Sequence, residues 1–213
     1  MEVVKHEHAC VSLVAAGRRL VVDPGIWTDP GVLEVADAVL VTHAHVDHVD
    51  EPALRAALGG RPELHVWTNP ELARALAGPS GQVHAVREGD RFEAAGLAVR
   101  AVGEQHAVIH PEVPRVANVG FVVEERFFHP GDALLDPGVP LELLCVPLHG
   151  PWVKVAELVD WVRRLAPRRT LAVHDGLLNA RGLAVVGRFL GPEGPGTGAE
   201  HVRLEPGESL LLA

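Results

Sequence analysis

Short apolar runs open the chain and predict a set of β-strands. Residues 3–4, 10–14 and 20–22 are apolar-rich, and Ala16-Gly17-Arg18 separates the last two runs, which is typical of strands joined by a hairpin. Asp23-Pro24-Gly25 ends the third run. Proline presets φ at the second position of a turn and glycine accepts a positive φ at the third, so we predict a type II turn there.

Strand-like and helix-like segments alternate through the rest of the chain. The apolar run 38–41 predicts a buried strand, and Pro52 followed by Gly59-Gly60 brackets a predicted helix over 51–58. The further predicted elements are a strand over 64–68, a helix over 69–77, hairpins over 91–102 and 117–128, a strand over 143–148, a helix over 153–165, a strand over 171–173, a helix over 177–190, and strands over 202–204 and 210–212. This alternation is what a layered α/β fold requires.

Length and composition indicate one globular domain over residues 1–213. Hydrophobic residues make up 47% of the chain and charged residues 22%, and no apolar run approaches the roughly 20 residues that cross a bilayer. The N-terminus lacks the basic start and apolar segment of a signal peptide, so we expect a soluble, cytoplasmic protein without a membrane partner. Cys10 and Cys145 lie in apolar surroundings and are interpreted as buried thiols.

The charge balance disfavours nucleic acid as a substrate. Nineteen basic residues against 28 acidic ones give a net charge of −9, which repels a phosphate backbone. The one candidate for a local basic groove is Arg163, Arg164, Arg168 and Arg169, at the end of a predicted helix, where cations interact with free carbonyls. We therefore expect a small-molecule substrate; the sequence leaves the oligomeric state open.

The most specific chemistry lies in residues 43–48, His-Ala-His-Val-Asp-His, directly after the buried strand 38–41. On an extended segment His43 and His45 point to the same side, so both imidazoles reach one cation. Asp47 and His48 follow in a turn and project toward a second cation beside the first. The pattern indicates a dinuclear metal site rather than a His-rich surface loop.

These six residues resemble the signature of the metallo-β-lactamase-fold hydrolases. The resemblance implies an α/β (α+β) fold, a four-layer αββα sandwich, and three later ligands at predicted strand ends. His106, His174 and Asp132 match those positions. In the resulting assignment His43, His45 and His106 hold one metal, Asp47, His48 and His174 hold the other, and Asp132 bridges them.

Several other residues are candidates for contacts around the metals. Asp23 matches a position where the family often places a carboxylate that supports a ligand histidine, and it is equally consistent with a turn former. His8 lies near the expected metal face and is interpreted mainly as a structural histidine. The remaining candidates, for the substrate side or for loop stabilisation, are His110, Arg115, Asn118 and His149. His65, His84, Trp152 and Trp161 are interpreted as packing residues.

The implied function is metal-dependent hydrolysis of a small ester, lactone, amide or phosphate ester. Two divalent ions, zinc first and manganese or iron as alternatives, lower the pKa of water toward about 7 and polarise the scissile group. Asp47 is the candidate catalytic residue, orienting the nucleophile as well as binding metal. The motifs around His106 and Asp132 look most like the branch that includes ascorbate-6-phosphate lactonase.

Three alternatives remain open from the sequence. A phosphodiesterase or nuclease-type hydrolase would use the same seven ligands, although no appended RNA-binding arm is visible. A mononuclear iron dioxygenase on the same fold is compatible with the histidines, whereas His45 argues against the diiron electron-transfer pattern, which usually has a carboxylate there. A non-catalytic binding module is disfavoured by the complete ligand set.

Overall fold

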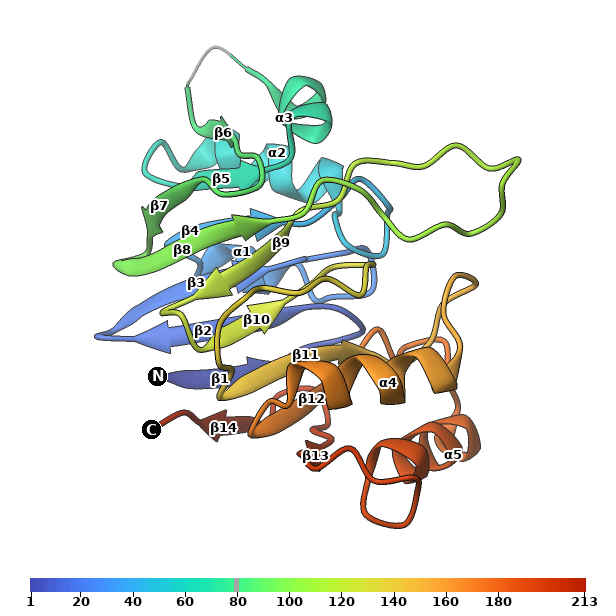
Figure 1. The fold of residues 1–213 in the computed structure, drawn as a ribbon. Helices are drawn as coiled ribbons and strands as arrows, with labels where there is room; N and C mark the ends of the chain where they lie inside the picture. Colours follow the sequence, from blue (N-terminus) through green and yellow to red (C-terminus); the bar gives the residue numbers. More distant parts are fainter. Residues whose placement is uncertain (79–80) are drawn as a thin grey trace.

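The computed structural model describes residues 1–78 and 81–213, and its strands form two seven-stranded sheets. The strands of the first sheet, in spatial order, are β14 (Ser209–Leu211), β1 (Glu2–Lys5), β2 (Val11–Ala15), β3 (Arg18–Val22), β4 (Ala38–Val41), β5 (His65–Thr68) and β6 (Val83–Ala85). Those of the second are β13 (Glu200–Val202), β12 (Arg169–Val173), β11 (Leu143–Pro147), β10 (Phe127–His129), β9 (Gly120–Val123), β8 (Leu97–Val102) and β7 (Arg91–Ala94). Figure 1 shows the two ends of the chain close together, on β1 and β14.

The helices cover the outer faces of the sheets (Figure 1). Helices α1 (Gly31–Glu34), α2 (Glu51–Gly60) and α3 (Pro70–Leu76) lie on the first sheet, and α4 (Val155–Leu165) and α5 (Ala180–Leu190) lie on the second. One apolar cluster joins the inner faces of both sheets, with Leu13, Phe121 and Leu171 among its fully buried members. Two further clusters lie under the helices. The predicted αββα sandwich is confirmed.

Most predicted elements form within one to three residues of their expected bounds. Helix α5 begins at Ala180 rather than at residue 177, because the side chain of Asn179 accepts hydrogen bonds from Arg181 and Gly182 and caps the helix there. The short helix α1 was not predicted, since four residues carry no helical periodicity. None of the helices in the described part of the chain combines the length and apolar character that a membrane crossing requires.

The type II turn predicted at Asp23-Pro24-Gly25 is wrong. Asp23, and not Gly25, has the positive φ, of 52°, and the N–H of Gly25 donates to the carbonyl of Asp23 at 2.9 Å, two residues back. Glycine is required at position 25 for another reason: a Cβ there would lie 2.0 Å from the carbonyl oxygen of Asp47. The backbone of the His-rich motif therefore packs directly on this turn.

The packing roles predicted for His65, His84 and the two cysteines are confirmed. Nδ1 of His65 and Nε2 of His84 lie 2.8 Å apart on neighbouring strands, and both rings pack on Trp67. Cys10 and Cys145 are free and buried.

The loops at one end of the two sheets are tied together across the sandwich. The N–H of Val119, before β9, donates to the carbonyl of Thr42 after β4 at 3.0 Å. The N–H of His174, after β12, donates to the carbonyl of His8 between β1 and β2 at 3.1 Å. The segments that carry the predicted ligands therefore meet at the same end of the molecule.

Candidate metal centre

Histidine and aspartate side chains from loops of both sheets gather into two adjoining clusters. In each cluster one ligand-type atom from every residue lies within 4.8 Å of those of the others. The first contains His43, His45, His106 and Asp132, and the second contains His8, Asp47, His48 and His174. All seven side chains that the sequence assigned to two metals are thus brought together, and His8 joins them.

The first cluster is built around the end of β4. Nε2 of His43 lies 3.0 Å from Nδ1 of His45, so the two alternate residues of the motif do point to the same side. Nε2 of His106 lies 3.3 Å from Oδ2 of Asp132, and Nε2 of His43 lies 4.0 Å from the same oxygen. His43, His106 and Asp132 are buried, whereas His45 is partly exposed.

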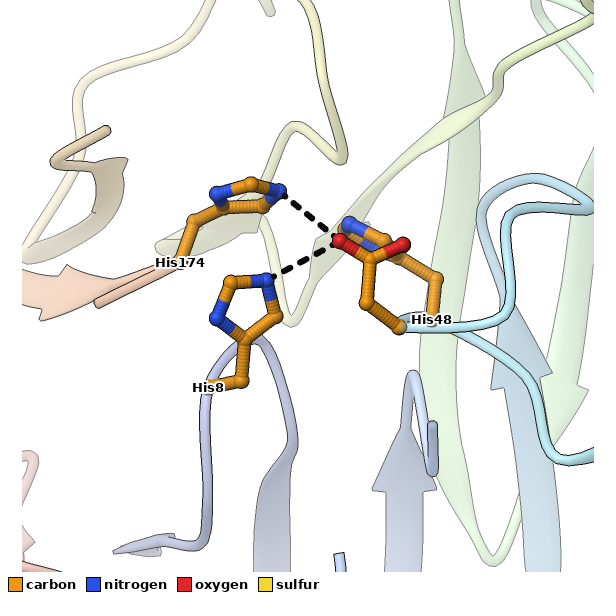
Figure 2. Close-up of side chains that lie close together, drawn as sticks. His8, His48 and His174 are labelled. Atoms are coloured by element: carbon orange, nitrogen blue, oxygen red, sulfur yellow. Dashed lines mark hydrogen bonds and ion pairs between the residues drawn. The ribbon is translucent and has the colours of Figure 1, made fainter. Parts of the chain in front are cut away.

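The second cluster shares Asp132 with the first. Oδ1 of Asp132 lies 3.2 Å from Nε2 of His48, and its Oδ2 lies 3.1 Å from Nε2 of His174. Oδ2 of Asp47 lies 3.5 Å from Nε2 of His174 and 3.2 Å from Nε2 of His8. Figure 2 shows His8 and His174 directed at one carboxylate oxygen, with the His48 ring beside it. Asp132 therefore faces both clusters.

The tautomers of three histidines are set by partners at Nδ1. Nδ1–H of His48 donates to Oδ2 of Asp23 at 2.7 Å, and Nδ1–H of His106 donates to the carbonyl of Ala107 at 2.6 Å. The Thr42 hydroxyl donates its hydrogen to Asp23, so it can only accept from His43, and Nδ1–H of His43 donates to Oγ1 of Thr42 at 2.9 Å. In all three rings Nε2 is therefore the nitrogen that faces the cluster and that can bind a metal in its deprotonated form.

Asp23 thus has the supporting role that the sequence left open beside that of a turn former. Its carboxylate is fully buried and accepts the backbone N–H of Thr42 at 2.7 Å and the Thr42 hydroxyl at 2.8 Å, in addition to His48. The side chain joins the end of β3 to the start of the motif. It fixes the direction of the His48 ring.

The structure separates the other candidate residues. Asn118 is fully buried, donates to the carbonyl of Pro130 and accepts the N–H of Asp132 at 3.0 Å, so it shapes the Asp132 loop and has no surface for substrate. Arg115 donates to the carbonyl of His106 at 2.9 Å, and His110 accepts the N–H of Glu112 at 3.2 Å within its own loop. His149 is exposed and lies in neither cluster.

Trp152 is a site residue that the sequence did not predict. Its Nε1–H donates to Oδ2 of Asp132 at 3.0 Å, and its ring lies edge-on to His106 and His174. Trp152 is buried, as the packing interpretation predicts, but its N–H adds a contact with the site that the sequence did not reveal. Trp161 packs in the core and donates to the carbonyl of Leu135. Trp27 was also missed; it is 41% exposed and contacts the edge of the His8 ring.

The electrostatics of the clusters favour positive charge. Burial opposes the charged form of His48, but the carboxylates of Asp132 and Asp23 beside it raise its pKa well above the usual value. Burial likewise opposes charge on His174, and contacts with Asp132 and Asp47 raise its pKa to about 9. Burial works against ionisation of Asp132 as well, but the charge on His48 and contacts with the histidines hold its pKa well below the usual range. Burial and the charge on His48 lower the pKa of His43, which stays neutral.

The ligand-type atoms fit divalent cations. Among the described residues, Nε2 of His48, His106 and His174 and Oδ1 of Asp132 are buried, and although they lie 3.1–3.3 Å from opposite groups, none of these contacts has the geometry of a hydrogen bond. Buried polar atoms are rarely left in this state, because it costs about 1–3 kcal/mol each. Imidazole nitrogens and carboxylate oxygens are among the ligands that zinc prefers, so cations would satisfy these atoms.

Known proteins share both the sequence and the fold. Protein Rv0786c of Mycobacterium tuberculosis is 36% identical over 192 residues, which cover 86% of this chain and 89% of that protein. UPF0173 metal-dependent hydrolase TTHA1283 of Thermus thermophilus is 28% identical in an alignment that covers 96% of each chain. The fold matches that of Igni18, a metallo hydrolase from Ignicoccus hospitalis, with a TM-score of 0.71 and 16% identity over 98% of this chain and 97% of the other.

The family follows from the extent of these matches. A family model described as the β-lactamase superfamily domain matches residues 2–174, which include all seven predicted ligands. The more specific resemblance to the ascorbate-6-phosphate-lactonase branch stays a prediction. Because the family model and a 36% identical relative both span most of the sequence, the chain belongs to the β-lactamase superfamily, in which several of its relatives are named metal-dependent hydrolases.

Proposed function

We propose that this protein hydrolyses a small ester, lactone, amide or phosphate ester with two divalent metal ions, zinc in the first place. His43, His45 and His106 would hold one ion, Asp47, His48 and His174 the other, with Asp132 between them. The observation that carries the proposal is the shared position of Asp132, whose two oxygens face histidines of both clusters. Two such ions supply a water nucleophile at neutral pH and polarise the scissile group.

The chain's own residues contribute orientation. Three histidines are oriented by hydrogen bonds from Nδ1–H, which are accepted by Thr42, Asp23 and the Ala107 carbonyl. Each of these bonds directs Nε2 of its ring toward the centre. Nε1–H of Trp152 restrains Oδ2 of Asp132. The side chain of Asp47 is 19% exposed, so a substrate can reach its carboxylate. This carboxylate would orient the substrate and the attacking water.

The surroundings of His45 favour a substrate with an uncharged group next to the scissile bond. A small cavity beside His45 and His106 is lined mainly by apolar side chains, Ile109, Val113 and Pro114 among them. Its one cation, Arg115, already donates to the carbonyl of His106. The cavity, about 30 Å³, has room for little more than a water molecule, so an alkyl or aryl group would lie against the apolar side chains at its rim. Such a surface favours esters, lactones and amides over phosphodiesters.

An iron dioxygenase is the rival from a different chemical class. A mononuclear site needs one cluster of ligands, whereas here two clusters of four side chains adjoin. This duplication supports a dinuclear centre.

Metal analysis of protein purified without added metal tests the proposal. We expect about two zinc or manganese ions per chain and hydrolysis of aryl esters or lactones in a panel that also contains amides, phosphodiesters and thioesters. His45→Ala and His174→Ala should each retain one ion, and His149→Ala, an exposed histidine outside both clusters, should retain two. One iron per chain with substrate-dependent oxygen consumption would overturn the proposal.

A further inference from the structure

His8 joins the second cluster from the N-terminal hairpin, far in sequence from the other members. Its side chain is 1% exposed, and its backbone is left-handed, with φ of 55°. The ring is held on two sides, edge-on to Trp27 with ring centroids 4.6 Å apart and tilted on His174 with centroids 4.0 Å apart. Its orientation is therefore fixed by packing as well as by hydrogen bonds.

The hydrogen bond at Nδ1 distinguishes His8 from the three histidines whose Nδ1–H groups are donors. The backbone N–H of Gly176 donates to Nδ1 of His8 at 3.0 Å, so this nitrogen is the acceptor. In a neutral imidazole the other nitrogen then carries the proton. Nε2 of His8 lies 3.2 Å from Oδ2 of Asp47 and is its donor. A protonated Nε2 has no lone pair to give to a metal.

We propose that His8 is a positioning residue, whose Nε2–H holds the carboxylate of Asp47 for the second metal, and not a fourth ligand of that metal. The hydrogen bond restrains Oδ2 of Asp47, the oxygen that also lies 3.5 Å from Nε2 of His174, and so holds the carboxylate toward the second cluster (Figure 2). This inference rests on the proposed function, because it takes Asp47 to be a metal ligand.

The backbone of His8 also contacts the end of β12, which carries His174. Its carbonyl accepts the N–H of His174 at 3.1 Å and Nζ of Lys5 at 2.9 Å. Lys5 is itself buried and pairs with Asp175 at 3.2 Å. Asp47 and His174, on different sheets, are thus aligned through one residue, and this explains why a left-handed histidine is held in a buried position.

The tautomer is measured directly by long-range ¹H–¹⁵N correlation spectra of the histidine rings, before and after addition of zinc. We expect Nε2 of His8 to carry a proton in both states, whereas the Nε2 signals of His48 and His174 should move to metal-bound positions. Loss of the His8 Nε2 proton on zinc binding would identify His8 as a ligand and overturn the proposal.

A pair of substitutions tests the effect on metal binding. His8→Asn tolerates the left-handed backbone and keeps an acceptor for Gly176, but its amide is too short to reach Asp47. His8→Gln is longer, and its amide N–H reaches Asp47. We expect His8→Asn to weaken the second zinc about 10–100-fold in competition with a chelating indicator, with the first zinc unchanged. His8→Gln should recover most of that loss.

The outcomes separate this inference from the function on which it rests. If the unsubstituted protein takes up two zinc ions and His8→Asn binds the second as tightly, the positioning role alone is overturned. If the unsubstituted protein takes up no zinc, the proposed function fails and the role of His8 fails with it. Should His8→Asn not fold, the ring spectra of the unsubstituted protein decide the question.

Discussion

Oδ2 of Asp23 lies 2.7 Å from Nδ1 of His48, and both side chains are fully buried. The carboxylate accepts a hydrogen bond from this Nδ1–H and two more from Thr42, one from its backbone N–H and one from its hydroxyl. These hydrogen bonds fix the carboxylate in place, and it holds the imidazole with Nε2 toward Asp132.

Replacing Asp23 with asparagine should therefore weaken the second metal. Asparagine has nearly the same shape and tolerates the positive φ at this position, but it brings two N–H donors against Thr42 and His48, which already donate. We expect zinc affinity at the second position to fall about 10–100-fold, measured by competition with a chelating indicator. Equal affinity in the variant and the unsubstituted protein would show that the carboxylate does not direct the His48 ring.

Trp152 and Trp161 provide a matched pair for the role of an indole N–H. Trp152→Phe removes the donor to Asp132, whereas Trp161→Phe removes a donor to the backbone carbonyl of Leu135, away from the clusters. We expect the first variant to lose metal affinity and turnover, and the second to lose stability by about 1–3 kcal/mol while binding metal normally. Metal content and urea denaturation distinguish the two. The same loss of stability with full metal content in both would contradict a role of Trp152 in the centre.

Metal binding should release protons, because His174 without metal has its pKa raised to about 9. At pH 7.5 its ring is protonated and must lose that proton before Nε2 can bind a cation. Apparent zinc affinity should therefore rise with pH, by up to tenfold per unit from this group, and the contribution of this group should level off above pH 9. Calorimetric titration in two buffers of different ionisation enthalpy counts the protons released. If the affinity did not change between pH 7 and 9, Asp47 and Asp132 would not raise the pKa of His174 as described.

The sequence predicts well those metal ligands that lie together at the end of one strand. His43 and His45 share a side because a strand alternates its side chains, and that rule needs no partner strand. The three later ligands were placed because each follows an apolar run and matches a family position. These are local features, and they are visible in a stretch of about ten residues.

The contacts that were missed depend on residues far apart in the chain. The ring of His8 owes its tautomer to Gly176, 168 residues away, and no pattern near His8 encodes that hydrogen bond. Trp152 follows a buried strand as many core tryptophans do, and only the meeting of two loops turns its N–H toward Asp132. Asn118 looked like a substrate-side residue because its loop borders the centre, yet its amide is used entirely inside the fold.

Gly25 tests how closely the turn after β3 packs on the motif. A Cβ at this position would lie 2.0 Å from the carbonyl oxygen of Asp47 and 2.8 Å from the backbone nitrogen of His48, so Gly25→Ala must displace the segment that carries both ligands. We expect it to lower the free energy of unfolding by about 1–3 kcal/mol, as overpacking does, and to weaken the second metal. Urea denaturation with a chelator present measures the first effect, and zinc competition measures the second.

Gly59 is the control, since a Cβ added there meets nothing within 4 Å and the residue lies within α2. Gly59→Ala should leave metal binding unchanged and raise stability by about 0.5–1 kcal/mol, because alanine loses less conformational freedom than glycine in a helix. If Gly25→Ala behaved like Gly59→Ala in both measurements, the backbone of the motif would not rest on this turn. The absence of a side chain at position 25 would then need another cause.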